Sequence, residues 1–281
     1  MTTNTTTAGE GPTDGGAVAP APARFDLGAG WTRGNLRAAL DWSERAYARA
    51  TVETEWAHAL LGDGWCNLLG EPVRYTVIAL RGSHELRDFL ADGAAVFRRM
   101  ATGGRAHLGL ADSWESVKPQ VWARLTPDGR WPADGRHYVV TGHSKGGAEA
   151  EACALDLREA GVPWARIHVA TFGAPRNKDA ARARYYDRRL PGRTARVVHE
   201  LDAVARVPWS PWPGSWRHVR GKLFITADGR LVREPGWWTT GRSDLRELRR
   251  ALRELARGRA QELLIGDHLL GGYARDLPGG R

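Results

Sequence analysis

The chain has 281 residues, 42% of them hydrophobic and 26% charged, which is typical of a globular protein and excludes a wholly disordered one. The formal net charge is +9, carried almost entirely by arginine. No nucleic-acid-binding motif accompanies this charge, so we attribute it to compositional bias and expect no nucleic-acid partner. The sequence has no run of 18 apolar residues, so we predict no membrane-spanning helix.

The amino-terminal segment differs in composition from the rest. Residues 1–24 contain almost no large apolar side chains, so burial cannot offset the entropy of ordering them, and we expect a disordered tail. Residues 25–281 are expected to form a single domain. The first residues also lack the basic region and apolar run of a secretory signal peptide, which favours a cytoplasmic location.

Helical and strand-like patterns alternate after this tail. Apolar residues at helical spacing predict helices at 35–50 and 51–63, and a β-branched run that ends in glycine predicts a strand at 73–82. Residues 84–93 are predicted to form a short helix or a lid. Further predicted strands lie at 94–100, 137–142, 165–173 and 195–202, and further helices at 110–125, 145–161, 178–190 and 243–264. Residues 218–232 are typical of a hairpin.

This alternation predicts the fold class. Strands that alternate with helices form a mostly parallel sheet covered on both faces. Continuous apolar strands, such as the one at 137–142, fit burial on both sides. We therefore expect an α/β protein with a mostly parallel central sheet.

A serine stands between a predicted strand and a predicted helix. Residues 142–146 read Gly-His-Ser-Lys-Gly, and this G-x-S-x-G pattern at a strand-to-helix turn is typical of a serine nucleophile. The glycines let the strand and helix approach closely. The amino terminus of the helix supplies N–H groups to a developing oxyanion. Ser144 is therefore the candidate nucleophile.

A serine nucleophile requires a general base and an acid that orients it. Asp202 ends a predicted strand, which is where α/β sheets place their sites. Two histidines, His218 and His268, follow it, and the order Ser, Asp, His along the chain fits either of them. The residues alone leave both open.

Several sequence blocks from about residue 70 onward resemble those of class 3 lipases, the fungal-lipase-like branch of the α/β-hydrolases. The blocks are VIALRGSHELRDFLAD (77–92), GGRAHLGLADSW (103–114), VVTGHSKGGAEA (139–150), VATFGAPRNKD (169–179), VVHELDAVARVPW (197–209), WRHVRGKLFI (216–225) and GDHLLGGY (266–273). The resemblance implies an α/β-hydrolase fold. It also implies a lipase or phospholipase that cleaves acyl glycerols through an acyl-enzyme.

The resemblance also assigns site residues. It implies Ser144 as nucleophile, Asp202 as acid and His268 as base, which favours His268 over His218. It implies an oxyanion hole formed by the backbone N–H groups of Ser83 and Lys145. A non-catalytic binding module of the same fold and a short-chain esterase remain as alternatives. Serine chemistry needs no cofactor, and no histidine has metal-ligand spacing, so we expect neither a cofactor nor a metal.

Two features leave their roles open. Lys145 stands where the family commonly has leucine, and its side chain is expected either to pair with Glu149 or to meet an anionic head group. Residues 243–258 combine a leucine stripe with many arginines. Such a helix either contacts an anionic membrane surface or packs its leucines on the core.

Overall fold

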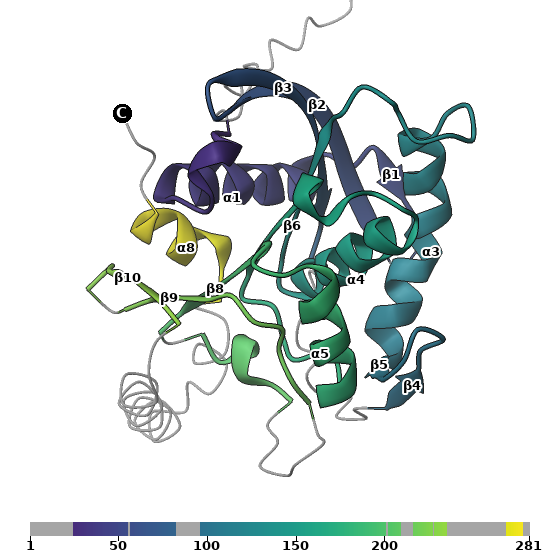
Figure 1. Ribbon diagram of the computed structural model, residues 1–281. Coiled ribbons are helices and arrows are strands. Elements are labelled where there is room, and N and C mark those ends of the chain that lie inside the picture. Colours follow the sequence, from purple (N-terminus) through teal and green to yellow (C-terminus); the bar gives the residue numbers. More distant parts are fainter. Residues whose placement is uncertain are drawn as a thin grey trace, which may run out of the picture.

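The computed structural model describes residues 25–55, 57–82, 96–200, 202–208, 216–226, 228–234 and 268–277. Its centre is an eight-stranded sheet in the order β1-β2-β3-β6-β7-β8-β9-β10 (Figure 1). Strands β3, β6, β7, β8 and β9 run parallel, and antiparallel hairpins extend both ends. The bounds are β1 Val52–Glu53, β2 His58–Leu68, β3 Glu71–Leu80, β6 His137–His143, β7 Ile167–Phe172, β8 Thr194–His199, β9 Lys222–Ile225 and β10 Leu231–Arg233.

Helices cover both faces of the sheet (Figure 1). One face carries α1 (Arg33–Ala48) and α8 (Leu270–Asp276), and the other carries α3 (Leu108–Leu125), α4 (Lys145–Glu159) and α5 (Ala180–Arg189). Three 3-10 turns, η1 (Leu27–Ala29), η2 (Trp164–Arg166) and η3 (Val204–Arg206), and a separate small hairpin of β4 (Phe97–Arg99) and β5 (Arg105–His107) complete the described elements. The predicted α/β fold with a mostly parallel sheet is confirmed.

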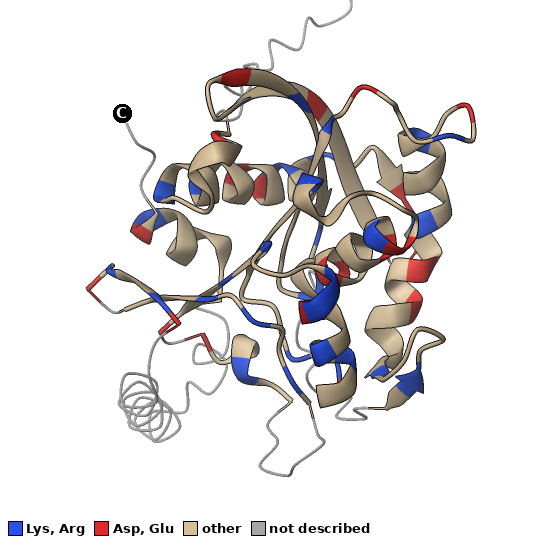
Figure 2. Ribbon diagram, viewed as in Figure 1, with Lys and Arg blue, Asp and Glu red and all other residues tan. Residues whose placement is uncertain are grey.

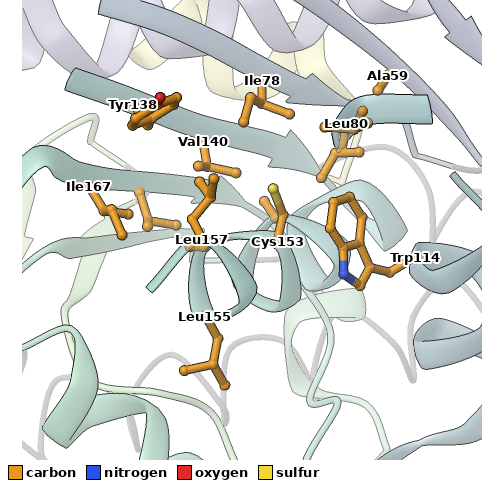
Figure 3. Close-up of a cluster of buried hydrophobic side chains, with 14 of the residues drawn as sticks. Ala59, Ile78, Leu80, Trp114, Tyr138, Val140, Cys153, Leu155, Leu157 and Ile167 are labelled. Atoms are coloured by element: carbon orange, nitrogen blue, oxygen red, sulfur yellow. The ribbon is translucent and has the colours of Figure 1, made fainter. Parts of the chain in front are cut away.

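Two hydrophobic clusters, one on each face, hold these layers together. On the α4 face, Tyr138 and Val140 of the sheet lie against Leu157 and Cys153 of the helix, with Trp114 of α3 beside them (Figure 3). All five side chains are almost completely buried. Burying a large apolar side chain contributes roughly 1.5–3 kcal/mol each, so this cluster fixes the helix that carries the serine corner.

The predicted helix at 51–63 is wrong. These residues form β1 and most of β2, and β2 pairs with β3 through ten consecutive residue pairs. Gly62 lies against the Trp42 ring of α1, where an added Cβ would come within 2.2 Å of the ring. Long-range pairing and this close approach outweigh the local helical spacing of the apolar residues.

The other predicted elements that the structure describes agree with it to within a few residues. The hairpin of β9 and β10 turns through Gly229, which has a φ of 75°. The predicted tail at 1–24, the lid at 84–93 and the helix at 243–264 lie outside the described residues. Figure 2 shows Lys and Arg on helices at both faces of the sheet and on the strands, so the basic residues do not form a single stripe. Among the described helices, none is long and apolar enough to cross a membrane.

Candidate active site

The serine corner joins β6 to α4. Ser144 has φ 57° and ψ −127°, a conformation that costs roughly 1–3 kcal/mol for a residue with a side chain. Its backbone N–H donates to the carbonyl of Phe172 at 2.9 Å. An added Cβ on Gly142 would lie 2.2 Å from the Gly146 carbonyl oxygen, and one on Gly146 would lie 2.1 Å from that of Leu80. Both glycines are therefore required for the strands and helix to meet here.

The candidate acid and base are hydrogen-bonded to each other. His268 Nδ1 lies 3.0 Å from each carboxylate oxygen of Asp202. Asp202 is completely buried and His268 is 2% exposed. A carboxylate can only accept, so Nδ1 carries the proton and Nε2 presents a lone pair. This is the tautomer that a general base requires.

Further donors surround the Asp202 carboxylate. Oδ1 accepts from the backbone N–H groups of Val204 at 2.9 Å and Ala205 at 3.3 Å, and Oδ2 accepts from the Tyr273 hydroxyl at 2.5 Å. Burial alone would raise the pKa of Asp202, but His268 and the Tyr273 hydrogen bond hold it below its ordinary value. The carboxylate therefore stays charged near neutral pH.

Ser144 and His268 each carry a reactive atom with no partner. Ser144 Oγ and His268 Nε2 are buried, and neither has a hydrogen bond within the described residues. His143 Nε2 donates to the His268 carbonyl at 2.6 Å, and the two rings lie 4.5 Å apart between centroids. The base is thus attached directly to the residue that precedes the nucleophile. Burial and the neighbouring His268 lower the pKa of His143 to about 3, which keeps this ring neutral.

Gly173 allows the acid and base to pack together. It has a φ of 60°, and an added Cβ would lie 2.5 Å from Asp202 Oδ2 and 2.9 Å from His268 Nδ1. The sequence patterns assign no role to Gly173 or Tyr273. Both lie inside the quoted blocks at 169–179 and 266–273, and that position was the only signal available for them.

Of the two predicted oxyanion donors, the structure describes Lys145 but not Ser83. Lys145 is the first residue of α4, so its backbone N–H lies in the first helical turn directly after Ser144. Ser83 lies outside the described residues. Its neighbour Gly82 lies within the described residues, and a Cβ added there would lie 3.2 Å from Ser144 Cβ. The segment that leads to Ser83 therefore passes beside the nucleophile.

The Lys145 side chain pairs with Glu149, the first of its two expected roles. Its ammonium lies 2.5 Å from Glu149 Oε1, which also accepts from the Ser113 hydroxyl at 2.5 Å. Glu149 is completely buried, and this burial raises its pKa against the opposing effect of Lys145. The lysine charge therefore compensates a buried carboxyl group beneath the site.

His218 occupies a different position from His268. Its Nε2 donates to the Ala205 carbonyl at 2.8 Å, so it is committed to the backbone and makes no bond to Asp202. His107 precedes α3 and tilts against the Trp216 ring, with centroids 5.4 Å apart. Of the two candidate bases, only His268 contacts the acid. Among the described residues, no cluster of three or more His, Cys, Asp or Glu side chains is arranged to hold a metal ion.

Known proteins resemble this chain in sequence. The chain is 34% identical over 155 residues to "Secreted mono- and diacylglycerol lipase A" of Penicillium cyclopium, covering 54% of this chain and 48% of that protein. It is 34% identical over 163 residues to "Lipase" of Rhizomucor miehei, covering 56% and 43%. The chain thus spans about half the length of the curated relatives it matches.

Solved structures resemble it in fold. Rhizomucor miehei triacylglyceride lipase aligns with a TM-score of 0.53 at 26% identity, over 66% of this chain and 68% of that one. A triacylglycerol lipase described as having a serine protease triad at its catalytic centre aligns with a TM-score of 0.52 at 27% identity, over 66% and 68%.

The predicted cytoplasmic location is contradicted by these relatives. The proteins of Penicillium cyclopium and Fusarium solani are both named as secreted lipases. The prediction rested on a missing sequence pattern, which is weaker than a match to secreted proteins. The comparisons are consistent about the family: residues 77–211, which include the serine corner and Asp202, match the family described as "Lipase (class 3)". The predicted resemblance to class 3 lipases is confirmed over residues 77–211.

Proposed function

We propose that the protein is a serine hydrolase of carboxylic esters whose substrates are acyl glycerols. One observation carries the proposal: Asp202 orients His268, whose ring lies 4.5 Å from that of His143, the residue before the strained Ser144. Ser144 Oγ and His268 Nε2 have no hydrogen-bond partner among the described residues. Structural hydroxyls and imidazoles in a protein interior are normally hydrogen-bonded, so two such atoms at one corner indicate a reaction centre. The lipase names of the relatives support the acyl-glycerol substrate.

The proposed reaction follows from these groups. Ser144 Oγ attacks the ester carbonyl while His268 Nε2 takes its proton, and Asp202 stabilises the resulting imidazolium. His268 then protonates the leaving alcohol, which leaves an acyl group on Ser144. Water, activated by the same histidine, releases the acid and restores the serine.

The backbone N–H groups of Lys145 and Ser83 are proposed to bind the oxyanion. The Lys145 N–H stands at the amino terminus of α4, where the helix dipole favours negative charge. Removing one donor of this kind costs roughly 10²–10³ in rate. Because the donor is the main chain, the pairing of the Lys145 side chain with Glu149 does not compete with it.

Both reactive residues are buried. Ser144 is 1% exposed and His268 is 2% exposed, so an ester cannot reach them until covering atoms move. A bulky acyl glycerol is therefore expected to bind only after such a displacement. The energy for it has to come from substrate contacts away from the reacting carbonyl.

A fluorophosphonate probe and an ester series test this function. Wild-type protein should be labelled and should hydrolyse p-nitrophenyl esters, with a further gain on emulsified diacylglycerol. Ser144→Ala should abolish both. Ser116→Ala is the matched control, because that serine lies on α3 and bonds Thr54 and Ser113 instead. Folded wild-type protein that resists labelling would indicate a non-catalytic binding module, and hydrolysis of short esters alone would indicate a soluble esterase.

A further inference from the structure

A buried arginine on β8 has no hydrogen-bond or ion-pair partner for its side chain among the described residues. The Arg196 side chain is 6% exposed, yet it makes no hydrogen bond and no ion pair within the described residues, and its Nε is completely enclosed. Burial lowers its pKa to about 10, so it remains protonated at neutral pH. Buried guanidinium groups are almost always paired. An uncompensated one indicates that an anion is the missing component.

Arg196 lines a cavity of about 240 Å³ over the face of β8 and β9 opposite α1 and α8. One water molecule needs only about 10–15 Å³ of such space, so the cavity accommodates a ligand of several atoms. The other described residues that line it are Arg176, Val198, Ala205, Arg206, His218, Lys222 and Phe224. None of them is acidic, and four of the eight lining residues are Arg or Lys.

The other three cations of the lining, Arg176, Arg206 and Lys222, are engaged elsewhere. Arg176 donates to the carbonyls of Arg206 and Pro208, Arg206 donates to a backbone carbonyl as well, and the Lys222 ammonium stands 4.9 Å from the Phe224 ring centroid. Two carboxylates influence Arg196 through space, and both have other partners. Glu151 pairs with Lys178, and Glu234 accepts two backbone N–H groups.

His218 adds an acceptor to the same cavity. Its Nε2 donates to the Ala205 carbonyl, so Nδ1 of the neutral ring carries a lone pair, and this buried atom has no partner within the described residues. Burial keeps the pKa of His218 well below its ordinary value, which maintains the neutral form. The cavity therefore offers the Arg196 guanidinium as a donor together with one acceptor. A complementary ligand has several anionic oxygens and one hydroxyl.

We propose that this cavity binds a hydrogenphosphate group, either as free phosphate or as a phosphate monoester such as the head group of phosphatidic acid. Arg196 donates to the anionic oxygens in the fork geometry that suits phosphate, and the P–OH donates to His218 Nδ1. Sulfate has the same shape and charge but no hydroxyl at neutral pH, so it satisfies only part of the site. Ala205 and Arg206 of the lining belong to the Val204–Arg206 turn, and the N–H groups of Val204 and Ala205 bind the Asp202 carboxylate.

Thermal unfolding and calorimetric titration test this proposal at constant ionic strength. Inorganic phosphate should bind the wild type saturably and raise its Tm, sulfate should bind distinctly more weakly, and chloride should have no specific effect. Arg196→Met should weaken phosphate binding roughly tenfold or more, the loss expected for a charge-assisted hydrogen bond. Arg196→Lys should retain partial binding. Arg220→Met is the matched control, because that arginine is 90% exposed and lies outside the cavity.

Binding assays with soluble phosphates and with lipid vesicles distinguish free phosphate from a lipid phosphate as the ligand. Binding of free phosphate and glycerol 3-phosphate without binding to vesicles indicates a soluble ligand. Binding to phosphatidic acid vesicles, but not to phosphatidylglycerol vesicles, indicates the lipid monoester, because the phosphodiester has no P–OH. Equal affinity for sulfate overturns the hydrogenphosphate assignment. The site is overturned if phosphate stabilises the wild type no more than chloride does. It is also overturned if Arg220→Met loses as much phosphate binding as Arg196→Met. The comparison of anions on the wild type remains valid even if Arg196→Met fails to fold.

Discussion

The hydroxyl of Tyr273 provides a sharp test of how the buried acid is maintained. It donates to Asp202 Oδ2 at 2.5 Å and accepts from the His199 backbone N–H at 3.2 Å. Tyr273→Phe removes both bonds without removing the ring, which is completely buried. The variant leaves a backbone N–H without a partner and removes one of the donors that keep the carboxylate charged.

The expected size of the effect follows from the charge of the acceptor. A hydrogen bond to a charged group contributes about 1.5–3 kcal/mol, and we expect the free energy of unfolding to fall by this amount near neutral pH. Tyr273 helps to hold the pKa of Asp202 below its ordinary value. Stability from a lowered carboxyl pKa is present above the unfolded pKa and is lost as pH falls through the folded one. The deficit of the variant should therefore shrink in acid.

Urea unfolding at neutral and acidic pH measures this deficit. Tyr186→Phe is the matched control, because Tyr186 is equally buried but its hydroxyl meets the neutral hydroxyl of Thr194 at 2.8 Å. Its deficit should be about 1 kcal/mol and independent of pH over this range. We also expect kcat/KM for a short ester to fall roughly tenfold in Tyr273→Phe only, since a freed carboxylate orients the base less well. Equal deficits in the two variants, or a Tyr273→Phe deficit that persists in acid, would refute the reasoning.

Two further substitutions test the packing around the serine corner. Gly173→Ala would place a methyl group 2.5 Å from Asp202 Oδ2, and we expect kcat/KM to fall by roughly 10². Gly192→Ala shares the positive φ, at 67°, but points into open space, so it should lose stability and keep activity; parallel ester kinetics decide the comparison. Lys145→Leu leaves buried Glu149 without its cation, so we expect destabilisation by about 3–5 kcal/mol near neutral pH. This deficit should diminish as pH falls and the carboxyl protonates, and adding Glu149→Gln should restore stability at neutral pH; a pH-independent deficit in urea titrations would contradict the pairing.

The sequence predicted the features that depend on local rules. The strand, the serine corner and the helix behind it are encoded within residues 137–159, where apolar residues and glycines impose one geometry. The alternation of elements then predicted the parallel sheet. The helix predicted at 51–63 failed because those residues are determined by their pairing with β3, which begins only at residue 71. Local spacing contains no information about that partner.

The candidate site was predicted only in part for the same reason. Chain order leaves His218 and His268 equivalent as bases, the family resemblance favours His268, and the hydrogen bonds to Asp202 distinguish it from His218. His143 holds His268 through a contact between residues far apart in the chain. The unpaired guanidinium of Arg196 likewise depends on distant segments that pack around it. No pattern within one segment reports them.

The attachment of the last helix to the first has a consequence for the timing of synthesis. Helix α8 follows His268 directly and contacts α1, where Arg37 donates to the Ala274 carbonyl across 237 residues of chain. A ribosome has therefore exposed the serine, the acid and nearly the whole sheet before the base and its anchoring helix emerge. We expect nascent chains that end before residue 268 to be inert towards esters. Chemistry would then begin only once His268 and α8 have emerged and packed against the rest of the chain.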